Sequence, residues 1–130
     1  MDRIIKTLLF GSEPECRAAA EVLVALDHLT GHTHDWRCAD DLEELEMLIA
    51  DWNPTLLIVL ADGAKGMEGV YRARDRRPGL PVFWFSDDRE FGMQSYRLGC
   101  AYFATKPLTQ DKIHHAIRRC DHVGISYAGL

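Results

Sequence analysis

The chain has no apolar run long enough to cross a membrane, and its N-terminus lacks the apolar stretch of a signal peptide. We therefore expect no membrane contact and a cytoplasmic location. Basic residues are also scarce, because 15 Lys and Arg stand against 20 Asp and Glu, for a formal net charge of -5. A nucleic-acid surface needs clustered positive charge, so the composition predicts no direct nucleic-acid binding by this domain.

Paired cysteine motifs are absent. The four cysteines are far apart, without the spacing of metal-binding or redox motifs, and the prediction is reduced, mostly buried thiols: Cys16, Cys38, Cys100 and Cys120. His32 and His34 would share one face of a strand, but no further ligand is close in sequence, so we expect solvated histidines and no metal site.

No glycine-rich phosphate loop follows the first expected strand, and no nucleophile and base stand out as a pair. From these absences we expect that the protein binds no nucleotide cofactor and is not an enzyme.

The sequence does contain a regular alternation of apolar runs and segments of helical period. Its 130 residues, 47% of them hydrophobic, suit one domain with a proper core. Strands are expected at 4–10, 33–38, 56–60, 81–86 and 101–105, and helices at about 13–30, 41–52, 67–77, 87–98 and 110–120. This order predicts a single α/β domain with a doubly wound parallel sheet. The domain should span 1–120, with 121–130 as a tail or the start of a linker.

Several residues mark the ends of these elements. Ser12 is a helix N-cap with a glutamate three residues later, and Gly31 lies just past the end of the same helix. Asp40 or Asp41 can cap the second helix, and Asp87 or Asp88 the fourth. The glycine-bearing segment Asp62 to Gly66 indicates a loop before the third helix.

In such a sheet, ligands bind at the edge formed by the C-terminal ends of the strands. The sequence delivers a distinct set of groups to that edge. They are Gly11, Ser12 and Glu13 from the first strand, Ala61 and Asp62 from the third, Ser86 from the fourth, and Lys106 from the fifth.

Two of these groups end short apolar runs, Pro81 to Ser86 and Ala101 to Pro107, and the second run ends in Thr-Lys-Pro. With Phe10-Gly11-Ser12-Glu13-Pro14-Glu15 and Gly66-Met67-Glu68-Gly69, they resemble a response-regulator receiver domain over about residues 3 to 120. Pro107-Leu108-Thr109 and Met93-Gln94-Ser95-Tyr96 are most similar to receivers attached to LytTR-type DNA-binding domains.

The resemblance implies a flavodoxin-like (βα)5 fold with strand order 2-1-3-4-5. It places Ser86 and Lys106 where receivers hold a phosphoryl group, and Phe103 where they have a switch aromatic. It also implies a partner surface on the fourth helix, fifth strand and fifth helix, with candidate contact residues Arg97, Tyr102, Lys112, His115 and Arg119.

The sequence departs from the receiver pattern at the carboxylates, which are the acidic pair and the acceptor aspartate. The acidic pair is replaced by Gly11 and Ser12, so Glu13 alone remains near that corner, and the acceptor position falls on Ala61 or Leu60. None of these replacements is a carboxylate, and Mg²⁺ in such sites needs carboxylates together with phosphate oxygens. We therefore expect no Mg²⁺ site of receiver type and no cofactor.

Asp62, Ser86 and Lys106 each have two interpretations. Asp62 is either an atypical phospho-acceptor or a turn residue before Gly63, and the second is favoured. Ser86 is more simply the cap of the fourth helix than a phosphoryl contact. Lys106 could pair with Asp62 or Glu13 and fix the loops at the sheet edge.

Three functional hypotheses follow. The favoured one is a degenerate receiver that regulates an output, such as transcription, through protein contact or homodimerisation. The second is a working atypical receiver phosphorylated on Asp62. The third is a flavodoxin-like domain that binds a small anionic ligand at Ser86 and Lys106.

Overall fold

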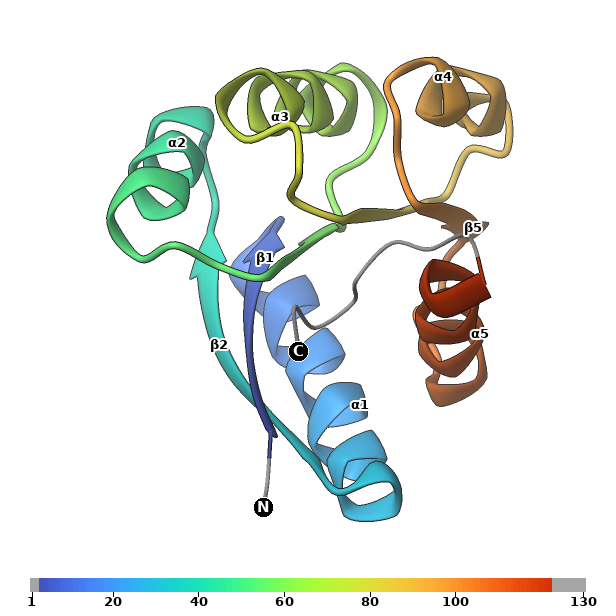
Figure 1. The fold of residues 1–130 in the computed structure, drawn as a ribbon. Coiled ribbons are helices and arrows are strands. Elements are labelled where there is room, and N and C mark those ends of the chain that lie inside the picture. The colour runs from blue at the N-terminus through green and yellow to red at the C-terminus, as the bar shows by residue number, and fades with distance from the viewer. Residues whose placement is uncertain (1–2, 123–130) are drawn as a thin grey trace.

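The computed structural model describes residues 3–122 as one α/β domain (Figure 1). The elements, in chain order, are β1 (Arg3–Phe10), α1 (Glu13–Thr30), β2 (His32–Ala39), α2 (Leu42–Asp51), β3 (Leu56–Val59), α3 (Gly63–Arg76), β4 (Val82–Ser86), α4 (Phe91–Arg97), β5 (Tyr102–Thr105) and α5 (Gln110–His122). The sheet has the order β2-β1-β3-β4-β5, and every neighbouring pair is parallel. The predicted flavodoxin-like (βα)5 fold is confirmed.

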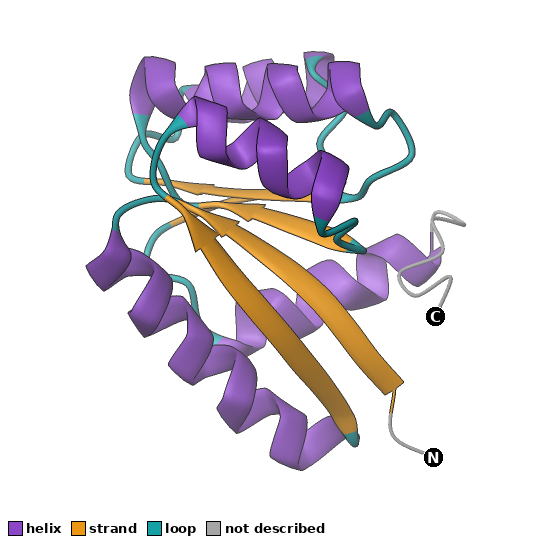
Figure 2. Ribbon diagram, turned by 90° about the vertical axis from the view of Figure 1, so that its left-hand side faces the viewer, coloured by secondary structure: helices purple, strands orange, loops and turns teal. Residues whose placement is uncertain are grey.

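The helices cover both faces of the sheet. α1 and α5 lie on one face, and α2, α3 and α4 lie on the other (Figures 1 and 2). Each face has its own buried cluster, one including Leu23 of α1 and Ile113 of α5, the other including Leu45 of α2 and Val70 of α3. All four residues of β3 are buried, as expected of a central strand covered on both sides.

The end signals of the first two helices act as the sequence indicates. The Ser12 side chain accepts a hydrogen bond from Glu15 N, and Gly31 closes α1 with a φ of 75° in the left-handed region. Of the two aspartates that could cap α2, Asp41 is the cap, because its side chain accepts from Glu44 N. A positive φ is strained for a side chain but not for glycine, which explains the residue at position 31.

The glycines before Glu68 do not form a loop, which corrects the expectation for that segment. α3 begins at Gly63 and carries Gly66 and Gly69 inside the helix. A Cβ at Gly66 would lie 2.1 Å from the carbonyl oxygen of Ala61, and one at Gly69 would lie 2.4 Å from the Phe10 ring. These glycines therefore allow α3 to pack closely on the sheet edge.

The fourth helix starts later than expected. Asp88 N donates to Ser86 Oγ at 3.1 Å, and Glu90 N donates to Asp88 Oδ1 at 2.9 Å. Both polar side chains thus stabilise a turn after β4, and α4 begins only at Phe91. Neither Ser86 nor Asp88 caps the helix itself.

The last helix includes two residues that were assigned to the tail, since α5 extends to His122. The rest of that segment, 123–130, lies outside the described residues. None of the helices within 3–122 is long and apolar enough to cross a membrane.

Candidate functional site

The Lys106 side chain is the centre of a charged cluster at the C-terminal rim of the sheet. Lys106 follows β5, and its backbone N–H donates to Ser86 O at 3.0 Å, which fixes it beside the end of β4. Its ammonium group donates to Asp62 Oδ2 at 3.1 Å and to Glu15 Oε2. The Lys106 side chain is only 15% exposed, so both carboxylates neutralise a largely buried cation.

Asp62 joins three strand ends at this rim. It follows β3 and precedes α3, and its carboxylate makes no capping bond to that helix. Asp62 Oδ1 instead accepts from Ser86 Oγ at 3.3 Å and from Asp87 N at 2.9 Å. The structure therefore brings Asp62, Ser86 and Lys106 together, with 44% of the Asp62 side chain open to solvent.

Glu15 belongs to the same cluster, although the sequence interpretation gave it only a capping role. Ser12 Oγ, the N-cap of α1, donates to Glu15 Oε1 at 3.0 Å, while Glu15 Oε2 accepts from Lys106. The signal was the capping-box spacing of Ser12 and Glu15, because a residue in the first turn of α1 also lies over the rim.

Glu13, the acidic residue expected at this corner, lies elsewhere. Its carboxylate binds Arg17 at 2.8 Å in a surface pair one helical turn along α1, and both side chains are about 70% exposed. The acidic residue of the α1 turn that meets Lys106 is thus Glu15.

The charges of the cluster reinforce one another. Partial burial disfavours the charged form of Lys106, but the hydrogen bonds and charges of Glu15 and Asp62 outweigh that effect and raise the pKa of Lys106. Burial likewise works against ionised Asp62, yet the Asp87 N–H, Lys106 and Ser86 together lower the pKa of Asp62. At neutral pH the cluster is an ammonium ion held by two carboxylates.

Packing encloses the two residues on which the sequence analysis places the acceptor position. Leu60 and Ala61 are both buried, and the Ala61 carbonyl oxygen accepts from Trp84 Nε1 at 3.1 Å. Neither side chain carries an oxygen, so Asp62 is the carboxylate that β3 presents at the rim.

The residues proposed as a partner surface lie on α4, β5 and α5. Tyr102 Oη lies 3.5 Å from His115 Nδ1, and Arg119 donates to the hydroxyl of Tyr96 at 3.2 Å. Lys112 donates to the carbonyl oxygens of Thr105 and Pro107. These contacts tie the three elements into one continuous surface, on which Arg97 is exposed.

Phe103 is half-buried on the other face of β5. Its ring meets Trp84 edge to face, with centroids 5.6 Å apart, and a Cβ at Gly92 of α4 would lie 3.5 Å from it. The Phe103 side chain therefore points inward, against Trp84 of β4.

Two predictions about cysteine and histidine are wrong. Cys16 of α1 and Cys38 of β2 form a disulfide, although the sequence predicted reduced thiols. The two residues are 22 positions apart, and only the packing of α1 beside β2 brings them together. His34 is buried rather than solvated, because Asp27 accepts from its backbone N at 2.9 Å and lies 2.6 Å from its Nδ1. The side chain of His32 lies outside the described part.

The residues of the rim do not fit a Mg²⁺ ion of receiver type. Gly11 and Ser12 supply no carboxylate, and Glu15 and Asp62 are both bound to Lys106. Within residues 3–122, no group of three or more His, Cys, Asp or Glu side chains could hold a metal ion.

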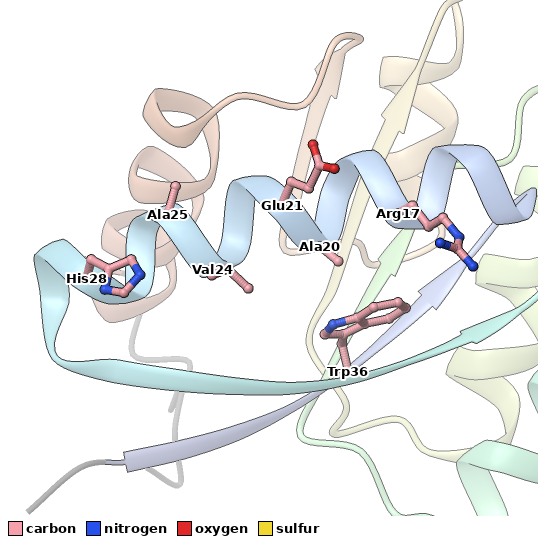
Figure 3. Close-up of a pocket in the computed structure, with 7 residues that line it drawn as sticks. All are labelled: Arg17, Ala20, Glu21, Val24, Ala25, His28 and Trp36. Carbon is pink, nitrogen blue, oxygen red and sulfur yellow. The ribbon is translucent and has the colours of Figure 1, made fainter.

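A groove runs along α1 on the side of β2 (Figure 3). Its volume is about 680 Å³, and it is lined by Arg17, Ala20, Glu21, Val24, Ala25, His28 and Trp36. Trp36 rises from β2 towards α1 and is 36% exposed. Trp36 and Cys38 are two residues apart on β2 and therefore share one face of the strand.

No protein-family model matches the chain, and no curated protein matches it. Solved structures do match, at identities that establish the fold alone.

Three similar structures illustrate this likeness. The signal receiver domain of a modulated diguanylate cyclase from Desulfovibrio desulfuricans G20 is 24% identical over 92% of this chain and 95% of that one, with a TM-score of 0.65. A CheY-like response regulator from Mesorhizobium loti is 22% identical over 89% and 98%, at 0.65. An orphan response regulator of H. pylori is 19% identical over 88% and 95%, at 0.67. The chain therefore has the CheY-like fold of response-regulator receiver domains.

Proposed function

We propose that this protein is a degenerate receiver domain, which signals through protein contact and is not switched by phosphorylation. The observation that carries the proposal is the Lys106 cluster. The cation that would meet a phosphoryl group is instead neutralised by Glu15 and Asp62 from the same chain.

Electrostatics favours this closed arrangement. A phosphoryl group carries up to two negative charges and would be placed beside Asp62 and Glu15. Receiver chemistry offsets such repulsion with a metal ion held by carboxylates, and Gly11 and Ser12 provide none. Adding a phosphoryl group would require Lys106 to break its contacts with at least one carboxylate.

Signalling would then depend on the surface of α4, β5 and α5. Basic side chains surround Tyr102 on this surface, namely those of Arg97, Lys112, His115 and Arg119. Such a surface favours a protein partner or a second copy of the chain. The regulated output, a LytTR-type or other DNA-binding domain among the possibilities, would lie outside residues 3–122. The function requires no enzymatic step.

The self-association part of this proposal is tested by light scattering over a range of protein concentrations. Arg119→Glu should shift a dimer towards monomer. The substitution removes the hydrogen bond from Arg119 to the Tyr96 hydroxyl, which links α5 to α4, and it places a carboxylate in the contact. Arg76→Glu, on α3 away from this surface, is the control. Equal masses for wild type and Arg119→Glu at every concentration would exclude a homodimer through α4, β5 and α5.

A second candidate function is phosphorylation on Asp62. It is favoured by one observation, namely that the Asp62 carboxylate is 44% exposed and touches both Ser86 and Lys106. It is opposed by the missing acidic pair.

Acetyl phosphate with Mg²⁺, followed by intact-mass measurement, separates these two candidates. The degenerate receiver gains no phosphoryl group. A gain in mass that disappears in Asp62→Asn but persists in Asp87→Asn would establish the second candidate and end the first. Asp87 is a suitable control because it is an exposed aspartate beside the same site.

The anionic-ligand hypothesis loses support because Lys106 is already neutralised. Inorganic phosphate is the simplest probe for it. A rise in melting temperature with phosphate that is lost in Lys106→Ala would restore this hypothesis, whereas an equal response in both proteins would reflect bulk salt.

A further inference from the structure

The disulfide lies one residue from the charged cluster. Cys16 is in the first turn of α1, directly after Glu15, and Cys38 is near the end of β2. Their Cα atoms are 6.2 Å apart. The bond therefore ties the turn that carries Glu15 to the edge strand of the sheet.

The two cysteine residues differ in exposure. Both line a cavity of about 310 Å³, but Cys16 is fully buried whereas Cys38 is half-buried. Thiol–disulfide exchange needs a thiolate to reach one sulfur atom in line with the bond. Cys38 is thus the sulfur that an incoming thiol can attack, and Cys16 is the leaving group.

The cavity in front of the disulfide has more negative than positive charge around it. Its rim carries the side chains of Glu13, Asp40 and Glu44; Glu13 is paired with Arg17 and Asp40 with Lys65, so three carboxylates stand against two cations. Trp36 forms an aromatic wall. Carboxylates beside an aromatic ring favour the binding of a small cationic molecule, through charge attraction and cation–π contact.

We propose that Cys16 and Cys38 are a reversible redox site that exchanges with small cationic thiols and controls how firmly Glu15 is held against Lys106. In the reductive direction, a thiolate attacks Cys38 Sγ, and the bond to Cys16 breaks. Cys16 leaves as a thiolate and takes a proton from water. A second thiol then attacks the mixed disulfide and releases Cys38, so two small thiols become one small disulfide. Oxidation is the reverse, with the small disulfide as oxidant.

The coupling follows from the geometry of the α1 turn. Ser12 Oγ orients the Glu15 carboxylate, and the disulfide anchors the next residue to β2. Reduction removes that anchor, so the turn gains freedom and the contact between Glu15 and Lys106 weakens. This inference concerns redox chemistry and goes beyond the proposed function, and it holds whether or not the domain is phosphorylated.

The first experiment tests the redox site itself. Thiol titration in denaturant should give two free thiols, from Cys100 and Cys120, before reduction and four afterwards. Reduction of the folded protein should be faster with cysteamine than with 2-mercaptoethanesulfonate at equal thiolate concentration, by on the order of tenfold at low salt. The ratio should fall at high salt, because screening removes the attraction.

Matched variants complete this experiment. Glu44→Gln should lower the rate ratio, whereas Glu90→Gln, an exposed glutamate beside α4, should leave it unchanged. Four free thiols after incubation with cystamine, or equal rates for the two reagents at low salt, would overturn the proposal.

The second experiment tests the coupling. Acylation of Lys106 by an amine-reactive ester, followed by peptide mass spectrometry, should be severalfold faster in reduced than in oxidised protein. Lys112, which is bound to the carbonyl oxygens of Thr105 and Pro107 and not to Glu15, should react equally in both states. Equal acylation of Lys106 in both states would remove the coupling from the proposal.

Cysteine variants identify the residues responsible. Cys38→Ser should react at Lys106 like reduced wild type, with or without reductant. Cys100→Ser should behave like wild type, because Cys100 is not part of the bond. Burial, only partly offset by Arg74, raises the pKa of Cys100 to about 12, so its thiol is a poor competitor in exchange.

Discussion

The two corners of the sheet rim differ in the side chains that they present. At the corner of β4 and β5, Ser86 and Lys106 bring a hydroxyl and an ammonium group together with Asp62. At the corner of β1 and β3 lie Gly11, Ser12 and a buried Ala61, none of which carries a carboxylate. One corner is therefore charged and the other is not.

The difference shows what a retained cation requires. An ammonium group with 15% of its side chain exposed is costly without a counter-charge. In this chain Glu15 and Asp62 supply that charge. The comparison therefore explains why Lys106 is stable at the rim without any bound anion.

The largest expected effect comes from a substitution at Gly66, where α3 packs against Ala61 and Trp84. In Gly66→Ala the new Cβ would meet the Ala61 carbonyl oxygen at 2.1 Å and Trp84 Nε1 at 2.9 Å. Backbone cannot move away cheaply, so overpacking should lower the free energy of unfolding by about 3 kcal/mol. Urea denaturation followed by tryptophan fluorescence measures this change.

Gly79→Ala is the matched control for that substitution. No heavy atom lies within 4 Å of a Cβ at position 79, and the residue has no positive φ. The free energy of unfolding should change by less than about 1 kcal/mol, towards greater stability. Equal losses in the two variants would show that Gly66 has no special packing role.

An intermediate effect is expected from removing the shared cation. Lys106→Met leaves two carboxylates side by side without a counter-charge. The pair is more buried than a surface ion pair but still open to water, so the loss of unfolding free energy should be about 1–2 kcal/mol. The control is Lys65→Met, which breaks the exposed pair with Asp40 and should cost less than about 0.5 kcal/mol.

The pH dependence sharpens the same comparison. The pKa of Asp62 is below its ordinary 3.8, so its stabilising effect is complete above pH 3.8 and is lost as pH falls through the folded pKa. The pKa of Lys106 is above its ordinary 10.5, so its effect is complete below pH 10.5 and is lost as pH rises through the folded pKa.

The stability difference between wild type and Lys106→Met should therefore be flat between these limits and shrink at both ends. Urea midpoints over a pH series measure it. A difference that grows in acid would contradict the charge assignment of the cluster.

The fold could be predicted because its signals are local. The apolar run that contains Leu56–Val59, the cap at Ser12 and the glycine at position 31 each act within a few residues. Alternation of strands and helices then leaves few possible arrangements of the chain. The polar residues Ser86 and Lys106 could be placed at the rim for the same reason.

The remaining features depend on contacts that no local pattern reveals. Glu15 meets Lys106 across 91 positions, and Cys16 meets Cys38 only because α1 lies against β2. Gly66 suggested a loop by its residue type, but its role is to admit a carbonyl oxygen and an indole. In each case the tertiary arrangement determines what the residue does.

The smallest expected effect concerns the β1 corner and the residue that orients Glu15. Ser12→Ala removes the N-cap of α1 and the hydrogen bond to Glu15 Oε1, so unfolding free energy should fall by about 1 kcal/mol. Ser12→Asp keeps a capping oxygen but adds a third carboxylate beside those of Glu15 and Asp62. It should restore most of the cap while weakening the hold of Glu15 on Lys106, because like charges repel. Urea denaturation gives the first quantity and Lys106 acylation the second. A Ser12→Asp protein that matches wild type in both measurements would mean that this corner no longer influences the charged cluster.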